Sequence, residues 1–214
     1  MQGARTEKEF EMLKIYQKEN LFRLLLCNGI ILLVYLLIFA KYSIARIIYK
    51  KTKWGVLVLE TNRCILRAFE EKDLESFMAY RNNEEWMNYQ GFKNLTKDEY
   101  REALLVPLDM DKGMQLAIAD KTTDYLLGDV YLSRKDKTIS IGYSINPSYS
   151  RKGYITEVLK ALLLKLKECY SNCEIVAMTE KENTPSKNLL LKLGFVYDGW
   201  VDKWQSEVYV YSNE

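Results

Sequence analysis

Hydrophobic and polar positions repeat with two different periods along residues 54–214, and this pattern predicts a mixed α/β domain. Runs rich in β-branched and aromatic residues predict strands at 55–66, 116–120, 126–133, 138–145, 174–179, 195–200 and 204–211. Apolar residues at helical spacing predict helices at 73–81 and from residues 96, 154 and 184 onward. The predicted order is β-α-α-β-β-β-α-β-α-β-β, with an antiparallel meander in the middle.

Residues that start and stop elements support this order. Asn146 and Pro147 end the strand at 138–145, because proline cannot donate to a ladder. Asn183 or Thr184 is the predicted cap of the next helix, which has Pro185 in its first turn. Gly194 closes that helix.

A second hydrophobic pattern lies before the domain, where residues 24–40 carry no charge. A membrane-spanning helix needs about 20 apolar residues, within a range of roughly 17–25. We therefore predict a polar segment at 1–20, a transmembrane helix with a basic flank at 21–49, and a domain at 54–214. The alternative is a buried or interfacial helix that packs on the domain. A signal peptide is disfavoured, because the polar lead is long and Lys41 and Arg46 crowd the cleavage position.

The charge distribution adds orientation and excludes one class of partner. Residues 1–53 have a formal charge of +6 and the remainder has −4, although the whole chain has only +2. The basic residues gather on the C-terminal flank of the apolar stretch, which predicts a single-pass membrane protein with its domain in the cytoplasm. The domain lacks the strong basic field of a nucleic-acid binder, so we expect no nucleic-acid partner.

Histidine is absent from the sequence, and this excludes several kinds of site. A Ser-His-Asp triad, a Cys-His pair and a His-ligated metal all require an imidazole. Cys169 and Cys173 are four residues apart without a second pair, so a zinc site is not expected. We predict reduced thiols and no bound metal.

Candidate chemistry centres on the loop that joins the strand at 138–145 to the helix beginning at Tyr154. A glycine-containing loop that opens a helix can present several main-chain N–H groups at one point, where the helix dipole is positive. Arg151 and Lys152 add charge of the matching sign. The loop is therefore a candidate phosphate or pyrophosphate site. The alternative is an ordinary strand-to-helix connection that binds nothing, as such loops are in most proteins.

Three stretches together resemble one known family. Residues 150–155 (SRKGYI), followed by Thr156 and Glu157, resemble motif A of the GNAT N-acetyltransferases, [RQ]-x-x-G-x-[GA] after a strand and a proline. Residues 183–186 (NTPS) and 192–195 (KLGF) resemble the N-x-x-S and K-L-G-F signatures of the RimJ/RimL-like branch. Residues 59–67 (LETNRCILR) resemble the first strand of that branch.

This resemblance implies the GNAT acyl-CoA N-acyltransferase fold, an α+β fold with a central, mostly antiparallel sheet flanked by helices. Here it would follow one N-terminal transmembrane helix. The implied reaction moves an acetyl group from acetyl-CoA to a primary amine by direct attack in a ternary complex. Acetyl-CoA would be the co-substrate, and no metal would take part.

The resemblance also implies roles for individual residues. The pyrophosphate would lie on Ser150, Arg151, Lys152, Gly153, Tyr154 and Ile155. The pantetheine arm would pair with the backbone of Ser144 and Ile145, like an added strand. Asn183 would bond the same arm, and Ser186 would protonate the departing sulfur. Asn183 and Ser186 are equally typical of a helix N-terminus, which is the alternative interpretation.

The sequence departs from the family pattern at three positions, Ser140, Ser150 and Ile155. Ser140 replaces a common acidic residue, and the branched Ile155 is expected to crowd the phosphates. The general base is left open among water and six residues, Glu84, Glu85, Asp198, Asp202, Glu207 and Tyr209. A second hypothesis is therefore a catalytically weak GNAT-like module that binds acyl-CoA or a partner. A third is an unrelated membrane-tethered scaffold.

The acceptor amine also has alternatives. The RimJ/RimL-like resemblance implies a protein N-terminus. Residues 80–82 (YRN), followed by Trp86 and Met87, resemble acetyltransferases of surface-sugar pathways, which favours a nucleotide-linked amino sugar of the cell envelope. In the family, the region of the aromatic loop at 84–92 helps to wall the acceptor pocket; ordinary loop packing is the alternative interpretation.

Overall fold

The computed structural model of the chain describes residues 59–212. The predicted segments at 1–20 and 21–49 lie outside these residues. Within the described part of the chain, every helix is too short or too polar to cross a membrane.

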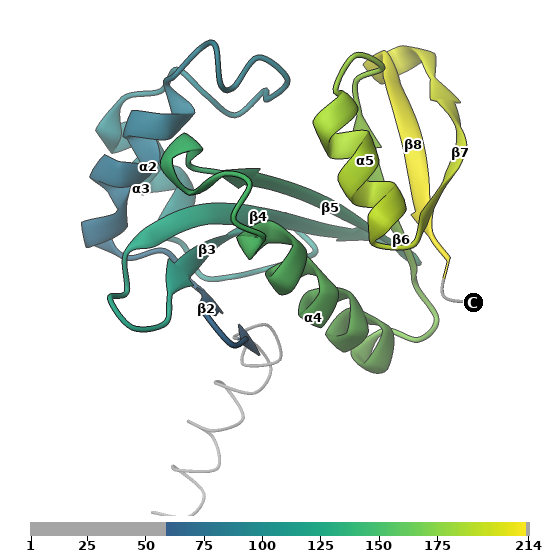
Figure 1. Ribbon diagram of the computed structural model, residues 1–214, viewed down its shortest axis with the longest axis horizontal. Helices are drawn as coiled ribbons and strands as arrows, with labels where there is room; N and C mark the ends of the chain where they lie inside the picture. The colour runs from purple at the N-terminus through teal and green to yellow at the C-terminus, as the bar shows by residue number, and fades with distance from the viewer. Residues whose placement is uncertain (1–58, 213–214) are drawn as a thin grey trace, which may run out of the picture. The chain divides into compact units, whose positions relative to one another are not determined.

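One eight-stranded sheet forms the centre of the domain, in the order β1-β2-β3-β4-β5-β6-β8-β7. Its strands are β1 (Leu59–Glu60), β2 (Cys64–Arg67), β3 (Met114–Asp120), β4 (Leu126–Lys135), β5 (Thr138–Ile145), β6 (Glu174–Thr179), β7 (Phe195–Val201) and β8 (Ser206–Tyr211). Its helices are α2 (Leu74–Arg81), α3 (Lys97–Leu104), α4 (Tyr154–Cys169) and α5 (Thr184–Lys192), with 3-10 turns at η1 (Glu71–Asp73), η2 (Pro147–Tyr149) and η3 (Asp202–Trp204). Figure 1 shows α2 and α3 at one end and the β7–β8 hairpin at the other. The predicted α+β class and, from α2 onward, the predicted element order are confirmed.

The first predicted strand is wrong in one respect. We expected a kinked strand at 55–66, whereas β1 and β2 are two strands that pair antiparallel, Leu59 opposite Leu66. The reason is a tight turn at residues 61–64. The Thr61 hydroxyl accepts a hydrogen bond from the Cys64 N–H (3.0 Å), and the Thr61 N–H donates to the Cys64 carbonyl (2.8 Å).

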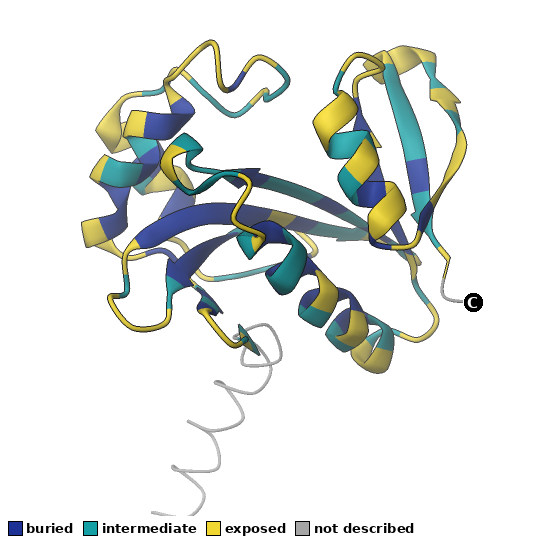
Figure 2. Ribbon diagram, viewed as in Figure 1, coloured by how far each residue is buried: buried dark blue, intermediate teal, exposed yellow. Residues whose placement is uncertain are grey.

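The helices cover the two faces of the sheet and form two apolar clusters. On one face α4 and α5 pack on buried residues of β3 to β6, such as Leu116, Val130 and Ile141. On the other face α2 and α3 pack over Ala117 of β3. Figure 2 shows the buried centre of the sheet beneath α4. The two faces therefore carry separate sets of side chains.

The sheet opens between β5 and β6, its only parallel pair among the described strands. The parallel register runs from Thr138 opposite Glu174 to Ile141 opposite Ala177 and ends there. Beyond that point β5 stays paired with β4 as far as Ile145, and β6 stays paired with β8 as far as Thr179. In Figure 1 the two strands diverge, β5 toward α2 and β6 beneath α5. This leaves one edge of β5 without a partner strand over its last residues.

Candidate active site

The N-terminus of α4 lacks the side-chain cap that two other helices have. The N-cap residue of α4 is Gly153, at φ +81° and ψ 2°, in the left-handed region that glycine adopts without strain. By contrast, the Thr96 hydroxyl caps α3 and the Asn183 amide oxygen caps α5. The sequence therefore places a residue without a side-chain acceptor where capping is usual.

The main-chain N–H groups at residues 153–156 consequently have no hydrogen-bond acceptor among the described residues. The first intrahelical bond here is made by Glu157, whose N–H donates to the Gly153 carbonyl (3.0 Å). Unpaired N–H groups at the positive end of a 16-residue helix suit an anion. The corner predicted from the glycine loop therefore offers main-chain donors that suit an anion such as a phosphate.

Side chains around this corner leave the amides open. Ser150 ends η2, Arg151 adopts φ +58°, and Lys152 donates from Nζ to the Ser148 carbonyl (3.0 Å). Ile155 is only 8% exposed and belongs to the core beneath α4. The expectation that Ile155 crowds the phosphates is wrong, because its side chain packs into the core.

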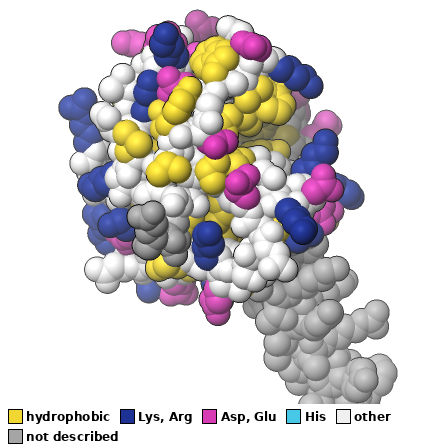
Figure 3. Space-filling model, turned by 90° about the vertical axis from the view of Figure 1, so that its right-hand side faces the viewer, with side chains coloured by type: hydrophobic (Ala, Val, Ile, Leu, Met, Phe, Trp, Pro, Cys, Tyr) yellow, Lys and Arg dark blue, Asp and Glu magenta, His cyan; other side chains and the backbone are white. Residues whose placement is uncertain are grey.

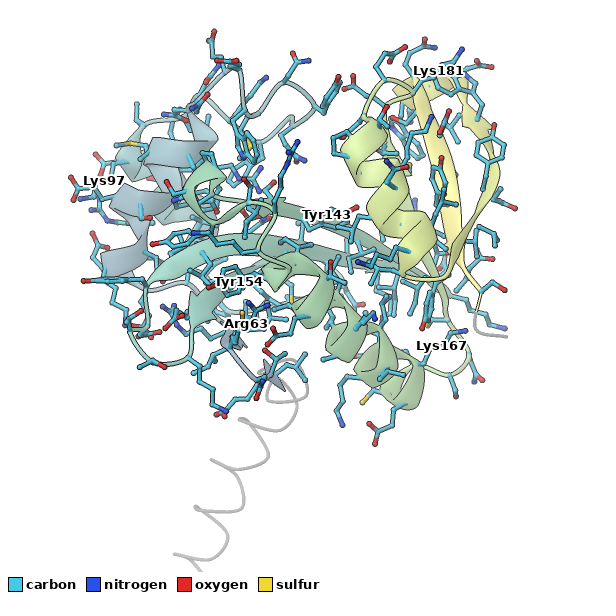
Figure 4. All side chains as sticks on the ribbon, viewed as in Figure 1. Arg63, Lys97, Tyr143, Tyr154, Lys167 and Lys181 are labelled. Atoms are coloured by element: carbon cyan, nitrogen blue, oxygen red, sulfur yellow. The ribbon has the colours of Figure 1, made fainter. Side chains whose placement is uncertain are left out.

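A clamp of three residues fixes the corner to the β1–β2 turn. Glu157 accepts hydrogen bonds from the Thr61 hydroxyl (2.6 Å), the Arg63 main chain (2.8 Å) and the Arg63 Nε (2.7 Å). Arg63 also donates from Nη1 to the Lys152 carbonyl (3.1 Å), and its guanidinium carbon lies 4.4 Å from the centre of the Tyr154 ring. Figure 4 shows Arg63 and Tyr154 beside each other at the start of α4. Desolvation raises the pKa of Glu157, but the bonds from Thr61 and Arg63 outweigh it and leave that pKa below its usual value.

The open edge of β5 presents the main chain of Tyr143 and Ile145. Their carbonyls accept side-chain bonds from the loop after α2, from Gln90 Nε2 (3.5 Å) and Trp86 Nε1 (2.7 Å) respectively. The Ser144 carbonyl points toward β4 instead. A Cβ added to Gly128 of β4 would clash with the Ser144 carbonyl oxygen. Of the two residues predicted to pair with a cofactor arm, only Ile145 therefore faces the opening.

The start of α5 faces the same opening and brings two predicted residues together. Asn183 Oδ1 accepts from the Ser186 N–H (3.2 Å), so Asn183 is the helix cap that the alternative interpretation expected. Ser186 Oγ lies 2.9 Å from the Tyr143 hydroxyl oxygen, and Figure 4 shows Tyr143 between β5 and α5. Burial raises the pKa of Tyr143 to about 12, although the bond to Ser186 lowers it.

Two buried hydroxyl groups flank the opening without a partner among the described residues. They are Ser144 Oγ on β5 and Thr179 Oγ1 on β6, and both residues follow the last parallel pair. Buried polar atoms normally find a partner, so these two hydroxyls are exceptions on the strands where the parallel pairing ends.

A pocket of about 400 Å³ lies on the α2 and α3 face of the sheet. Gln115, Tyr131 and Gly142 stand opposite one another on β3, β4 and β5 and form its floor. Its walls come from α2, α3 and the loop between them, with Arg81, Gln90, Phe92, Ala103 and Leu104. Gln90 and Phe92 belong to the aromatic loop at 84–92. The pocket can hold a small group beside the open end of β5.

A buried ion pair supports the wall of this pocket. Asp129 is 0% exposed and Arg81 is 2% exposed. The Asp129 carboxylate accepts from the Arg81 guanidinium, the Gln115 amide and the Tyr80 hydroxyl, the last at 2.6 Å. Arg81 Nε has no partner within residues 59–212. Because Asp129 already holds three donors, it is engaged in structure.

None of the six candidate bases lines the pocket. Glu84, Glu85, Asp198 and Asp202 are exposed, and Asp202 accepts from the Trp200 indole (2.8 Å). Glu207 accepts from Lys187 (3.2 Å) and from the Tyr209 hydroxyl (2.7 Å). Figure 3, which looks onto the β7–β8 end, shows acidic side chains scattered among exposed apolar ones. The base stays open, with water among the alternatives.

Sequence reasoning did not single out Asp129 and Tyr143. It placed the loop at 84–92 at the acceptor pocket but assigned no contact to Trp86 or Gln90. Asp129 carried a signal, since it is the single acid in an apolar strand (LLGDVYL). Tyr143 lies in the strand predicted at 138–145, but its partner Ser186 is 43 residues away. Trp86 and Gln90 come from a loop whose position no local pattern fixes.

The chain is similar in sequence to known acetyltransferases. The acetyltransferase (GNAT) domain family matches residues 63–196. The uncharacterized N-acetyltransferase YoaA of Bacillus subtilis is 30% identical over 149 residues, covering 66% of this chain and 84% of that protein. The uncharacterized N-acetyltransferase YnaD of the same organism is 27% identical over 161 residues, covering 71% and 94%.

Solved structures share the fold at lower identity. A GNAT-family acetyltransferase from Bacillus anthracis has a TM-score of 0.62 and 24% identity, covering 72% of this chain and 95% of that one. RimL, a ribosomal L7/L12 alpha-N-protein acetyltransferase solved with coenzyme A, has a TM-score of 0.62 and 14% identity, covering 72% and 96%. With the family domain matched over most of residues 59–212, the chain belongs to the GNAT family of acetyltransferases, whose general reaction is acetyl-CoA-dependent acetyl transfer.

Proposed function

We propose that this acetyltransferase moves an acetyl group from acetyl-CoA directly to a primary amine, with the two substrates entering from opposite faces of the sheet. The coenzyme would lie at the α4 and α5 face, and the amine would enter the pocket on the α2 and α3 face. The opening between β5 and β6 would let the thioester meet the amine.

The observation that carries this proposal is the uncapped start of α4. Its N–H groups at residues 153–156 would bind the pyrophosphate, with Arg151 and Lys152 adding charge. The pantetheine arm would pair with the main chain of Tyr143 and Ile145, in place of the bonds from Gln90 and Trp86. Tyr143 replaces Ser144 in this role, because the Ser144 carbonyl faces β4.

Three groups would assist the transfer itself. Asn183 would hold both the Ser186 main chain and the cofactor arm, since its oxygen caps α5 while its amide nitrogen donates to no acceptor among residues 59–212. Ser186 would give a proton to the departing sulfur. Proton removal from the attacking amine would fall to water, because the pocket lining offers no free carboxylate.

The acceptor would be a small amine or a protein N-terminus whose end fits about 400 Å³. A panel should therefore include peptides with free N-termini, a nucleotide-linked amino sugar and simple amines. Thiol release from acetyl-CoA by the full-length chain measures transfer on each. Turnover on one class names the acceptor, whereas saturable acetyl-CoA binding without turnover on any amine would favour the catalytically weak module.

We further propose that residues 21–49 anchor the protein in a membrane with the domain in the cytoplasm, as the apolar run at 24–40 and its basic flank support. Expression of the full chain and of a chain beginning at Trp54, followed by membrane fractionation, tests this. The full chain should sediment with membranes and the shorter one should not. A full-length product that stays in solution would contradict the anchor.

A further inference from the structure

The Tyr143 side chain lies in the opening, and the proposed mechanism uses only the main chain of this residue. Its hydroxyl oxygen lies 2.9 Å from Ser186 Oγ and 3.4 Å from the Ser186 carbonyl oxygen. The side chain crosses from β5 to the first turn of α5 and thereby spans the place where the sheet opens. A strand residue thus contacts the one hydroxyl that the family resemblance gives to sulfur protonation.

We propose that Tyr143 is a positioning residue that orients the Ser186 hydroxyl toward the thioester sulfur and restores its proton when the thiol leaves. The inference rests on the proposed function, because it presumes that Ser186 faces the sulfur. It adds a residue from β5 to a step assigned so far to α5 alone.

The relay requires the Tyr143 hydroxyl to be the donor in its bond with Ser186, although either hydroxyl can donate at this distance. Asn183 holds the Ser186 N–H, and this fixes the backbone that carries the hydroxyl. When the Tyr143 O–H donates to Ser186 Oγ, the hydroxyl hydrogen of Ser186 is not used in that bond and can be donated to another acceptor. The Ser186 carbonyl, at 3.4 Å, is too far away to compete well for the same phenol hydrogen. The serine hydrogen is then available for a partner in the opening.

Acidity explains why a second group is needed. A thiol such as that of cysteine has a pKa of about 8.5 and a free phenol about 10. Burial raises the pKa of Tyr143 to about 12, and an aliphatic alcohol is a weaker acid still. A serine alone therefore loses its proton to a thiolate only at high cost. With a phenol donating to its oxygen, Ser186 passes one proton on as it receives another, so that no alkoxide forms.

Atoms and electrons balance in this step. The C–S bond of the tetrahedral adduct breaks and its electron pair goes to sulfur. The Ser186 O–H bond breaks as the S–H bond forms, while the Tyr143 O–H bond breaks as a new O–H forms on Ser186. The resulting tyrosinate regains its proton from solvent, and nothing is oxidised or reduced. Burial keeps the phenol protonated beforehand, since it raises the pKa of Tyr143.

The thiol pKa of bound coenzyme A tests the relay without any acceptor. A hydrogen bond to the thiolate lowers the thiol pKa. We expect Tyr143→Phe and Ser186→Ala in the full-length chain each to raise it by about one unit, as loss of a charge-assisted bond implies. The double variant should show no further rise. Ultraviolet titration of the thiolate in the complex measures this, with Tyr125→Phe as matched control, because the Tyr125 side chain is 69% exposed.

Steady-state kinetics with the acceptor amine that the panel identifies give the second measurement. Tyr143→Phe should lower kcat by about 10²-fold, the usual contribution of a positioned acid, and leave the KM for acetyl-CoA near that of the unmodified chain. An unchanged thiol pKa in Tyr143→Phe would overturn the relay even if the enzyme turns over. A shift in Tyr143→Phe but none in Ser186→Ala would also overturn it, because the phenol would then reach the sulfur directly. Should Tyr143→Phe fail to fold, Tyr143→Leu removes the same hydroxyl and should raise the thiol pKa in the same way. Failure of the unmodified chain to bind coenzyme A would overturn both the relay and the proposed function.

Discussion

The candidate sites on the two faces of the sheet consist of different chemical groups. On the α4 face, the corner at residues 153–156 offers main-chain N–H groups, and one glycine sets its geometry. On the α2 face, the pocket is made of side chains from two helices, a loop and three strands, and a buried ion pair supports its wall. A site of backbone groups tolerates most side-chain changes, whereas a site of buried side chains does not. Substitutions on the two faces should therefore separate loss of binding from loss of stability.

The largest effect is expected on the pocket face, from Asp129→Asn. Removing one charge of a buried pair leaves the other uncompensated, so the free energy of unfolding should fall by about 3–5 kcal/mol. Urea denaturation of the purified chain measures this. Asp98→Asn is the matched control, because its pair with Arg101 is at the surface, with the aspartate side chain 83% exposed, and should cost less than about 1 kcal/mol. Equal losses in the two variants would show that the pocket wall does not depend on the ion pair.

The second-largest effect is expected from Ile155→Ala, on the α4 face of the sheet. The side chain is buried against the core, so its removal should cost about 2–3 kcal/mol of stability. Acetyl-CoA affinity should stay unchanged, because the amides and not this side chain form the corner. Calorimetric titration alongside denaturation separates the two quantities. Tighter binding without loss of stability would mean that Ile155 does crowd the phosphates after all.

Asp129 and Ile155 also show what the sequence allows one to predict. The strand, the proline break and the glycine before α4 are local signals, and β5 and β6 have the bounds that their patterns predicted. The corner needs only such local information, because its donors belong to consecutive residues. The expectation that Ile155 crowds the phosphates is wrong, because a sequence motif does not indicate on which side of a helix a residue lies.

The pocket face, to which Asp129 belongs, could not be predicted in the same way. Arg81 and Asp129 are 48 residues apart, and Gln115 and Tyr131 meet only through the register of β3 and β4. The opening itself depends on where the β5–β6 pairing ends, at Ile141, a point that no residue type marks. Contacts of this kind are set by tertiary packing, which overrides local preference.

A smaller effect is expected from Gly153→Ala, which tests the corner directly. A Cβ there would stand 3.6 Å from Arg63 Nη2, an ordinary contact, so the cost comes from φ +81° and not from crowding. An L-residue in this region pays about 1–2 kcal/mol. If the loop relaxes to avoid that cost, acetyl-CoA should bind about tenfold more weakly.

The control for this glycine is Gly91→Ala, where an added methyl group would meet no described atom within 4 Å and the backbone needs no positive φ. Calorimetric titration with acetyl-CoA compares the two variants. Undiminished affinity in Gly153→Ala, with the fold intact, would break the comparison, because the corner would then not depend on its backbone geometry.

The smallest effect is expected from Glu157→Gln, which loosens the clamp behind the corner. The folded-state pKa of Glu157 is lowered, so its charge contributes stability above the unfolded value of about 4.3 and loses that contribution as the pH falls through the folded value. At neutral pH the variant should be less stable by under about 1 kcal/mol, because Arg63 is 43% exposed. Urea midpoints of the two proteins should approach each other on acidification. If the difference between the two urea midpoints grew toward low pH, the sign of the predicted effect would be reversed. Glu157 would then be held in its protonated form and would not pair with Arg63 as an anion.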